Sequence, residues 1–171
     1  AELDLSGSDY LNQLEGTVTE HGFETAGYGS DWSIDKLDDR KKVWSGSEAL
    51  SKISGGQFNI IHHLGHSNTS YNMRLSSSGS LPNFQNKKPF IYYTQGCLAG
   101  RFWQGSFADK MVRNARSAAA VIANSSYGLA PEDPDPQSTK TPGASHMVHR
   151  QFVHAIFGKG AATIGAAHRA S

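Results

Sequence analysis

Three short apolar runs that alternate with helical patterns constrain the fold of this chain most strongly. The runs are Phe58–Leu64, Phe90–Thr94 and Ala118–Ala123, and the last is apolar at every position. Apolar residues at helical spacing precede the first run at Ser47–Ile53 and separate the other two at Phe107–Val112. Strands that alternate with helices predict an α/β fold whose sheet is mostly parallel and flanked by helices.

The two ends of the chain are predicted to be mainly helical. Ser8 and Asp9 are suitable N-cap residues for a helix whose apolar face runs to Val18 and which ends at residue 22. A short strand is expected over Phe23–Tyr28. Near the other end, apolar residues repeat at helical spacing and predict a helix over Ala144–Phe157, followed by a last helical stretch.

Composition and charge are those of one soluble globular domain. The 171 residues suffice for one hydrophobic core. The chain has 16 basic and 15 acidic residues, a formal net charge of +1 and no dense basic cluster, so nothing predicts a nucleic-acid partner. No apolar run approaches the roughly 20 residues of a membrane-spanning helix, so no membrane span is expected.

Two glycine-containing turns follow the first two predicted strands. The first turn reads LGHSN over residues 64–68, and the second reads QGCLAG over residues 95–100. Because the carboxyl ends of neighbouring parallel strands meet at one sheet edge, His66 and Cys97 are expected to lie close together. An adjacent imidazole lowers the pKa of a thiol and can protonate a leaving amine, while glycine lets backbone N–H groups approach a substrate carbonyl. The pair therefore predicts a nucleophilic cysteine with a histidine partner.

Other interpretations of these residues are open. Cys97 is the one cysteine of the chain, and a free cysteine is often a buried, inert thiol. His63 and His66 have a His-x-x-His spacing and could bind a metal ion such as zinc together with Cys97. The acidic residues of the proline-rich loop most simply face solvent, but they could also bind a structural calcium ion. These acidic residues are Glu132, Asp133 and Asp135.

Three segments of the chain together follow a known order. IHHLGHSN over residues 61–68 is an apolar block that ends in histidine, and FIYYTQGCLAG over residues 90–100 leads to a small residue and cysteine. VIANSSYG over residues 121–128 follows as a third strand and loop. This order resembles the caspase-like clan of cysteine peptidases and, within it, the gingipain family, over about residues 9 to 167. The resemblance implies a caspase-like three-layer α/β sandwich with a mostly parallel sheet.

The resemblance implies a role for each motif residue. Cys97 would be the nucleophile and His66 the general acid/base, and the backbone N–H groups of Cys97 and Ser67 would hold the oxyanion. Gingipains have glycine after the histidine, so Ser67 is a departure that keeps the backbone donor. The family also has an acidic residue that orients the histidine, for which Glu24 is one candidate. The implied reaction is peptide-bond hydrolysis through a thioester, which requires no cofactor.

Substrate-binding residues are also implied by the resemblance. Tyr127 takes the place of an aromatic pocket wall that is tryptophan in gingipains, and Gln95 and Gly96 of the nucleophile strand would also contact substrate. Asp9 lies near the position from which arginine-specific members reach a substrate guanidinium, which suggests cleavage after basic residues. Its simpler interpretation is a helix cap.

On the same resemblance, residues 1–171 form most of one caspase-like peptidase domain. A strand before the first helix is expected to be missing, and the full protein is expected to continue beyond residue 171. The expected partners are protein or peptide substrates and a companion chain from proteolytic processing. Family members are typically bacterial and either secreted or held at the cell surface. A non-catalytic caspase-like interaction module is the main alternative function, ahead of a His/Cys metal-binding domain.

Overall fold

The computed structural model describes residues 7–103, 105–130 and 140–171, which group into two compact units. The central unit consists of residues 36–128, and the terminal unit combines residues 1–35 with residues 129–171. Each unit has its own elements and its own buried residues, and each is described separately below.

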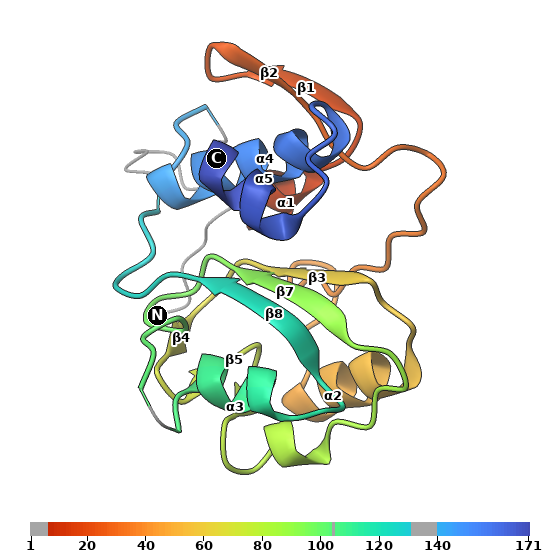
Figure 1. The fold of residues 1–171 in the computed structure, drawn as a ribbon, viewed down its shortest axis with the longest axis vertical. Helices are drawn as coiled ribbons and strands as arrows, with labels where there is room; N and C mark the ends of the chain where they lie inside the picture. The colour runs from red at the N-terminus through yellow and green to blue at the C-terminus, as the bar shows by residue number, and fades with distance from the viewer. Residues whose placement is uncertain (1–6, 104, 131–139) are drawn as a thin grey trace. The chain divides into compact units, whose positions relative to one another are not determined.

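A parallel three-stranded sheet forms the centre of the central unit (Figure 1). Its strand order is β3-β7-β8, and the strands span Ile60–His63, Phe90–Thr94 and Ala118–Ala123. The predicted bounds of β7 and β8 are confirmed, whereas β3 is shorter than the predicted run. An apolar run such as Ala118–Ala123 is typical of a strand buried on both faces, but of the β8 residues only Ala118 is buried. The strand lies at the edge of the described sheet, where fewer neighbours cover it.

Two helices cover one face of this sheet (Figure 1). Helix α2 spans Gly46–Gly55 and begins where the Ser45 hydroxyl accepts the Glu48 N–H at 3.1 Å. Helix α3 spans Phe107–Arg113, and Ser106 caps it in the same way. The buried core between helices and sheet also includes the 3₁₀ turn η1, and its larger members are Ile53, Leu81, Phe84, Phe90, Tyr92, Phe107 and Met111.

A small antiparallel sheet follows the first parallel strand. Its strands β4, β5 and β6 span Ser67–Asn68, Tyr71–Asn72 and Leu75–Ser76. The turn between β5 and β6 places Met73 at φ 50° and Arg74 at φ 58°, as in the two-residue turns that favour Asn-Gly. No glycine marks this turn, and the sequence pattern did not predict it.

Long-range contacts of Arg74 hold the left-handed turn. Its guanidinium donates to the Trp44 carbonyl and to the Asp39 carboxylate, the latter at 2.8 Å. The same group lies 4.5 Å from the centroid of the Trp44 ring. These interactions offset the steric cost of positive φ at two non-glycine residues. The turn therefore positions β5, whose Asn72 is fully buried beneath the site described below.

The terminal unit combines a short hairpin with helices from both ends of the chain. The predicted first helix is too long, because α1 ends at Asn12 and Val18 lies in a strand. Three consecutive β-branched residues in β1 and a left-handed turn at His21 (φ 59°) and Gly22 (φ 81°) favour a hairpin over a helix here. Ser8 and Asp9 lie inside α1 rather than capping it. The elements are α1 (Gly7–Asn12), β1 (Thr17–Glu20), β2 (Phe23–Ala26), α4 (Ala144–Phe157) and α5 (Ile164–Ala170).

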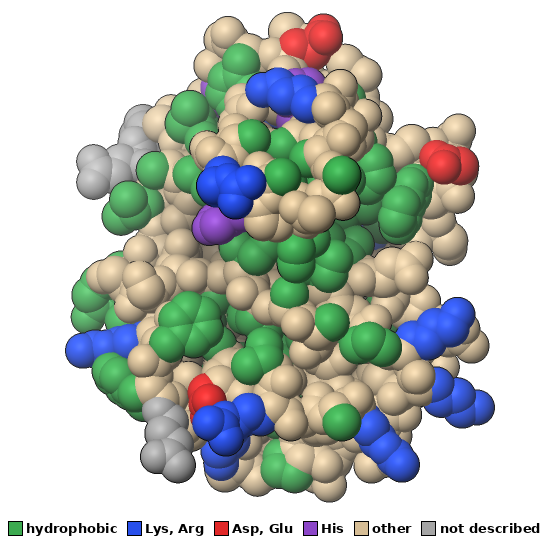
Figure 2. Space-filling view, in the orientation of Figure 1, with side chains coloured by type: hydrophobic (Ala, Val, Ile, Leu, Met, Phe, Trp, Pro, Cys, Tyr) green, Lys and Arg blue, Asp and Glu red, His purple; other side chains and the backbone are tan. Residues whose placement is uncertain are grey.

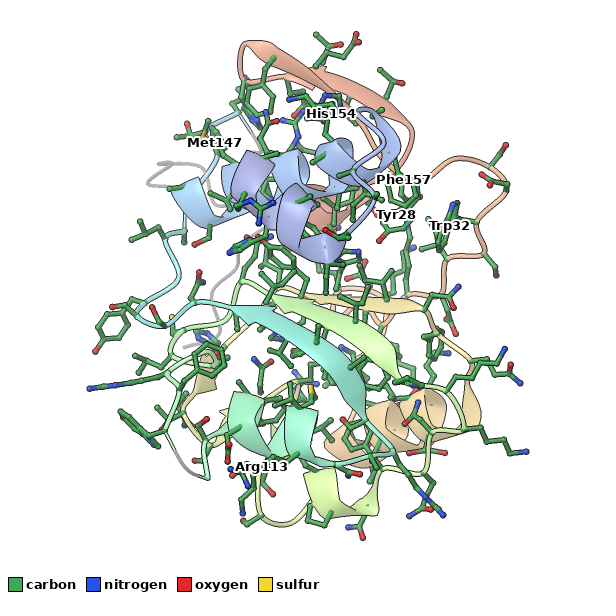
Figure 3. The ribbon with its side chains drawn as sticks, in the orientation of Figure 1. Tyr28, Trp32, Arg113, Met147, His154 and Phe157 are labelled. Carbon is green, nitrogen blue, oxygen red and sulfur yellow. The ribbon has the colours of Figure 1, made fainter. Side chains whose placement is uncertain are left out.

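An aromatic cluster and one buried arginine hold the terminal unit together. The rings of Tyr28 and Trp32 pack against that of Phe157 near the end of α4, with centroids 4.7 and 5.4 Å from it (Figure 3). Arg150 of α4 is fully buried and donates to the Val18 carbonyl and the Thr25 hydroxyl. The predicted bounds of α4 are confirmed.

The predicted mixed α/β fold is confirmed. A parallel sheet flanked by helices is consistent with a caspase-like sandwich. The three parallel strands of the central unit end at one edge of the sheet. His66 and Cys97, the predicted pair, follow β3 and β7 at this edge.

Candidate active site

Three loops leave the same edge of the parallel sheet. The register pairs His63 of β3 with Thr94 of β7, and Thr94 in turn with Ala123 of β8. His66 lies three residues after His63, and Cys97 lies three residues after Thr94, the residue paired with His63. The structure brings the two loops to one edge, as the strand pattern predicts.

The nucleophile loop is tied to the loop that follows β8. Leu98 adopts φ 60°, which is uncommon for a residue with a side chain, and its N–H donates to the Ser126 carbonyl at 2.7 Å. The Gly100 N–H donates to the Asn124 carbonyl at 2.9 Å, and the Asn124 side chain donates to the Gln95 carbonyl at 2.8 Å. The surrounding bonds therefore hold a sharp turn directly after Cys97.

The Cys97 thiol is half-buried and receives a backbone donor. The Gly128 N–H points to Cys97 Sγ at 3.4 Å. The N–H groups of Gly96 and Leu98 are bonded to protein oxygens, whereas no hydrogen bond within the described part of the chain uses the Cys97 N–H. The site thus combines a partly covered sulfur with an available amide donor.

Ser67 joins the histidine loop to the nucleophile loop. Its hydroxyl donates to the Cys97 carbonyl at 2.5 Å. A side chain on Gly96 would collide with the Ser67 hydroxyl, so glycine is required for this close approach. The Ser67 side chain therefore contacts the nucleophile residue directly, a contact that glycine could not make.

The His66 side chain is exposed to solvent, immediately after Gly65. A side chain on Gly65 would come within 2.8 Å of Nε2 of the buried His63 ring. The His63 ring instead uses Nδ1 for a 2.8 Å hydrogen bond with the Thr94 hydroxyl. Within the described residues, no group of three His, Cys, Asp or Glu side chains is arranged to hold a metal ion.

Comparison with known proteins identifies the family. The model of peptidase family C25, the gingipain family, matches residues 14–171. The chain belongs to this family. No curated protein and no solved structure matches the chain. The resemblance found in the motifs is confirmed, and membership of family C25 supports a peptide-bond hydrolase of the cysteine-peptidase type.

General properties of family C25 bear on where such a protein acts and on what. Gingipain-family members are extracellular or surface proteins, and peptidases act on protein or peptide substrates. Among the described residues, every helix is too short or too polar to cross a bilayer. On the face shown in Figure 2, the lysine and arginine side chains are scattered rather than gathered in one patch.

The remaining predicted residues of this family C25 chain lie in several places. Tyr127 is 71% exposed in the loop after β8, and Gln95 is buried, with its N–H donating to the His63 carbonyl. Asp9 lies in α1 and Glu24 in β2, both in the terminal unit, where Glu24 accepts the Thr19 hydroxyl. The three acidic residues considered for calcium fall in 131–139, outside the described residues.

Sequence reasoning missed several residues that build the site. Asn124 and Gly128 contact the nucleophile loop, and Asn72 and Thr94 lie beneath it. A signal existed for Asn124, because it directly follows the third strand at the same edge as the predicted pair. No such signal existed for Asn72, since the small sheet that carries it depends on the left-handed turn at residues 73–74.

Proposed function

We propose that this family C25 chain is the catalytic part of an endopeptidase, with Cys97 as nucleophile and His66 as general acid/base. The observation that carries the proposal is the geometry at one sheet edge: two loops joined by Ser67, a thiol that accepts the Gly128 N–H, and a Cys97 N–H left available. A nucleophile, a proton carrier and an oxyanion donor are the parts that acyl transfer requires.

The reaction proceeds in two halves. The Cys97 thiolate attacks the scissile carbonyl carbon, and a carbon–sulfur bond forms as the carbonyl oxygen becomes an oxyanion. His66 protonates the leaving amine, so the carbon–nitrogen bond breaks and a thioester remains. Water then gives a proton to His66 and attacks the thioester, which releases the acid and restores Cys97.

Backbone donors stabilise the oxyanion in this proposal. The Cys97 N–H is the first donor, because it belongs to the nucleophile residue itself and none of the described hydrogen bonds uses it. The Ser67 N–H is the second, and its loop is held against Cys97 by the Ser67 hydroxyl. Removing one such donor typically lowers turnover by about 100- to 1,000-fold, so their fixed placement matters.

Substrate recognition is proposed to involve the loop surfaces beside Cys97. Tyr127 offers an exposed aromatic ring, and Gln95 and Gly96, which directly precede the nucleophile, are proposed to contact the substrate backbone. Asp9 is proposed to pair with a basic side chain of the substrate, which gives cleavage after Arg or Lys. The chain is further proposed to act with a companion chain from processing, in an exported bacterial protein.

Fluorogenic peptides ending in Arg, Lys, Asn, Asp or Leu test this function. We expect cleavage after one residue type, and loss of cleavage by at least about 1,000-fold in Cys97→Ala, because the nucleophile is absent. Ser126→Ala is the matched control, since Ser126 contacts the nucleophile loop through its backbone carbonyl. Intact mass after treatment with a basic chloromethyl ketone should show a single adduct on Cys97.

Two outcomes contradict the proposal. Cleavage that persists in Cys97→Ala removes the assigned nucleophile. Silence across the whole panel together with no adduct on the folded protein favours the alternative, an interaction module that keeps the fold without the reaction.

A further inference from the structure

A chain of buried polar groups lies beneath the two loops of the proposed site. The Tyr92 hydroxyl donates to Asn72 Oδ1 at 2.8 Å, and Asn72 Nδ2 donates to the Thr94 hydroxyl at 3.2 Å. The Gly96 N–H donates to the same hydroxyl at 3.0 Å, and that hydroxyl meets His63 Nδ1 at 2.8 Å. Each of the four side chains is at most 8% exposed. Such a buried network fixes the positions of its side chains, because a buried polar group that loses its hydrogen bond costs free energy.

The donors and acceptors at the Thr94 hydroxyl favour one tautomer of the His63 ring. A hydroxyl oxygen has two acceptor positions, and Asn72 and Gly96 occupy both at Thr94. With both positions filled, an acceptor at His63 Nδ1 completes the network, and the ring then carries its proton on Nε2. Burial, aided by the charge of His66, lowers the pKa of His63 to about 4, which keeps this ring neutral at neutral pH.

His63 contacts both loops that carry the proposed dyad. Through Thr94 its Nδ1 is connected to Gly96, the residue before Cys97. Its Nε2 lies against Gly65, the residue before His66, and a Cβ atom on Gly65 would be only 2.8 Å from this nitrogen. The His63 ring is thus linked to the residue before Cys97 through Thr94, and it directly contacts the residue before His66.

We propose that His63 is a positioning residue for the Cys97–His66 pair, and that Thr94 transmits its position to the nucleophile loop; this inference rests on the proposed function. Small displacements of a catalytic group lower turnover strongly, so a rigid contact below both loops affects the rate. The neutrality of the ring also matters, because a second positive charge three residues from His66 would oppose the imidazolium that accompanies the thiolate.

Three variants of the network test the inference. Thr94→Val removes the hydroxyl at nearly equal volume, His63→Phe keeps a ring without an acceptor, and His63→Asn returns an acceptor near the Nδ1 position. Thr25→Val is the matched control, because Thr25 is a buried threonine of the terminal unit whose hydroxyl is bonded to Arg150. All four are compared with the unchanged chain at a temperature where each is folded.

The readouts are chosen to separate positioning from stability. They are the melting temperature, kcat and KM for the best peptide of the panel, and the rate of Cys97 alkylation by iodoacetamide as a function of pH. We expect Thr94→Val and His63→Phe to lower kcat by about 10- to 100-fold, with KM within about twofold. The midpoint of their alkylation profiles should move to higher pH, and His63→Asn should recover most of the lost kcat. Thr25→Val should lower the melting temperature alone.

Two results overturn the inference, and they are distinguishable. If Thr94→Val and His63→Phe behave like Thr25→Val, with lower melting temperatures but unchanged kcat and alkylation profile, the network is only structural. If His63→Phe does not fold, Thr94→Val decides alone. If Cys97 of the unchanged chain is neither alkylated faster than a free thiol at mildly acidic pH nor active on any peptide, the proposed function fails first, and the inference fails with it.

Discussion

Two buried histidines of the terminal unit and the exposed His66 of the central unit lie in opposite environments. In the terminal unit, His146 and His149 lie on the buried side of α4, and His146 Nε2 is bonded to Gln13 at 3.0 Å. Burial, together with the charge of Arg150, lowers the pKa of His146 to about 3, so the ring stays neutral. In the central unit, His66 follows a strand and is exposed. The difference teaches that position in the fold, rather than residue type, decides which histidine can exchange protons with a substrate.

Replacing His66 should produce the largest effect and tests this contrast directly. His66→Gln is expected to lower kcat by about 100- to 10,000-fold, the usual contribution of a general acid/base, with little change in melting temperature. His168→Gln is the matched control, because His168 is an exposed histidine of α5. Peptide cleavage and thermal unfolding are measured on both. Equal activity of His66→Gln and His168→Gln would show that His66 has no part in the reaction.

Replacing Arg150 should produce the largest effect on stability, and it probes the terminal unit. Arg150→Met removes donors to the Val18 carbonyl, the Thr25 hydroxyl and His21 Nδ1. Because buried acceptors are left unpaired, we expect a loss of about 2–4 kcal/mol in the free energy of unfolding. Urea denaturation followed by tryptophan fluorescence measures the loss.

Cys97 alkylation provides the control for the Arg150→Met experiment. All contacts described for Cys97 lie within the central unit, so its alkylation rate in the folded variant should stay within about twofold. Met147→Leu on the same helix is the matched substitution, since that side chain is exposed and its loss should be nearly neutral. A changed rate in Arg150→Met alone would mean that the two units are energetically coupled.

The fold could be predicted well where local patterns and tertiary structure agree. The bounds of β7, β8 and α4 follow from apolar runs and helical spacing, and the shared strand edge places the two candidate residues. The prediction was wrong for the first helix, because the β-branched residues of β1 and the His21 turn outweighed a helical pattern of apolar residues.

The supporting part of the site could not be predicted for a physical reason. Asn72 reaches Thr94 because the turn at Arg74 is held by Trp44 and Asp39, residues about 30 positions away in the chain. Similarly, Gly128 reaches Cys97 across 31 positions. Such contacts leave no local pattern, whereas the reactive residues stand next to glycines at strand ends and do leave one.

The neutral histidines predict loss of stability in acid from both units. The pKa values of His63 and His146 lie below the ordinary value of about 6.5, so the unfolded chain binds more protons than the folded one in mild acid. The free energy of unfolding should therefore fall as pH drops below about 6.5, by about 1.4 kcal/mol per pH unit for each histidine. Urea midpoints at pH 7, 6 and 5 measure this slope.

Substitution separates the contributions of the two histidines. His146→Gln should reduce the slope while the Cys97 alkylation profile stays unchanged, whereas His63→Phe should reduce the slope and alter that profile. His168→Gln is the control substitution, because His168 is an exposed histidine of α5. A slope that neither variant changes would show that other groups cause the acid sensitivity.

The Ser67 hydroxyl gives the smallest effect and the finest test of the central unit. Ser67→Ala removes a hydrogen bond to the Cys97 carbonyl, which should cost about 1 kcal/mol or about a fivefold loss in kcat/KM, if that energy positions the nucleophile. Ser67→Gly restores the residue that gingipains have there and should lose slightly more, because glycine adds backbone freedom. Ser70→Ala is the matched control, since in the described part of the chain the Ser70 hydroxyl bonds the exposed Asn68 side chain of the same hairpin. Steady-state kinetics on the best peptide resolve a fivefold difference. Equal kcat/KM for Ser67→Ala and Ser70→Ala would mean that the two loops keep their alignment without this contact, which leaves the network beneath them as the element that aligns the pair.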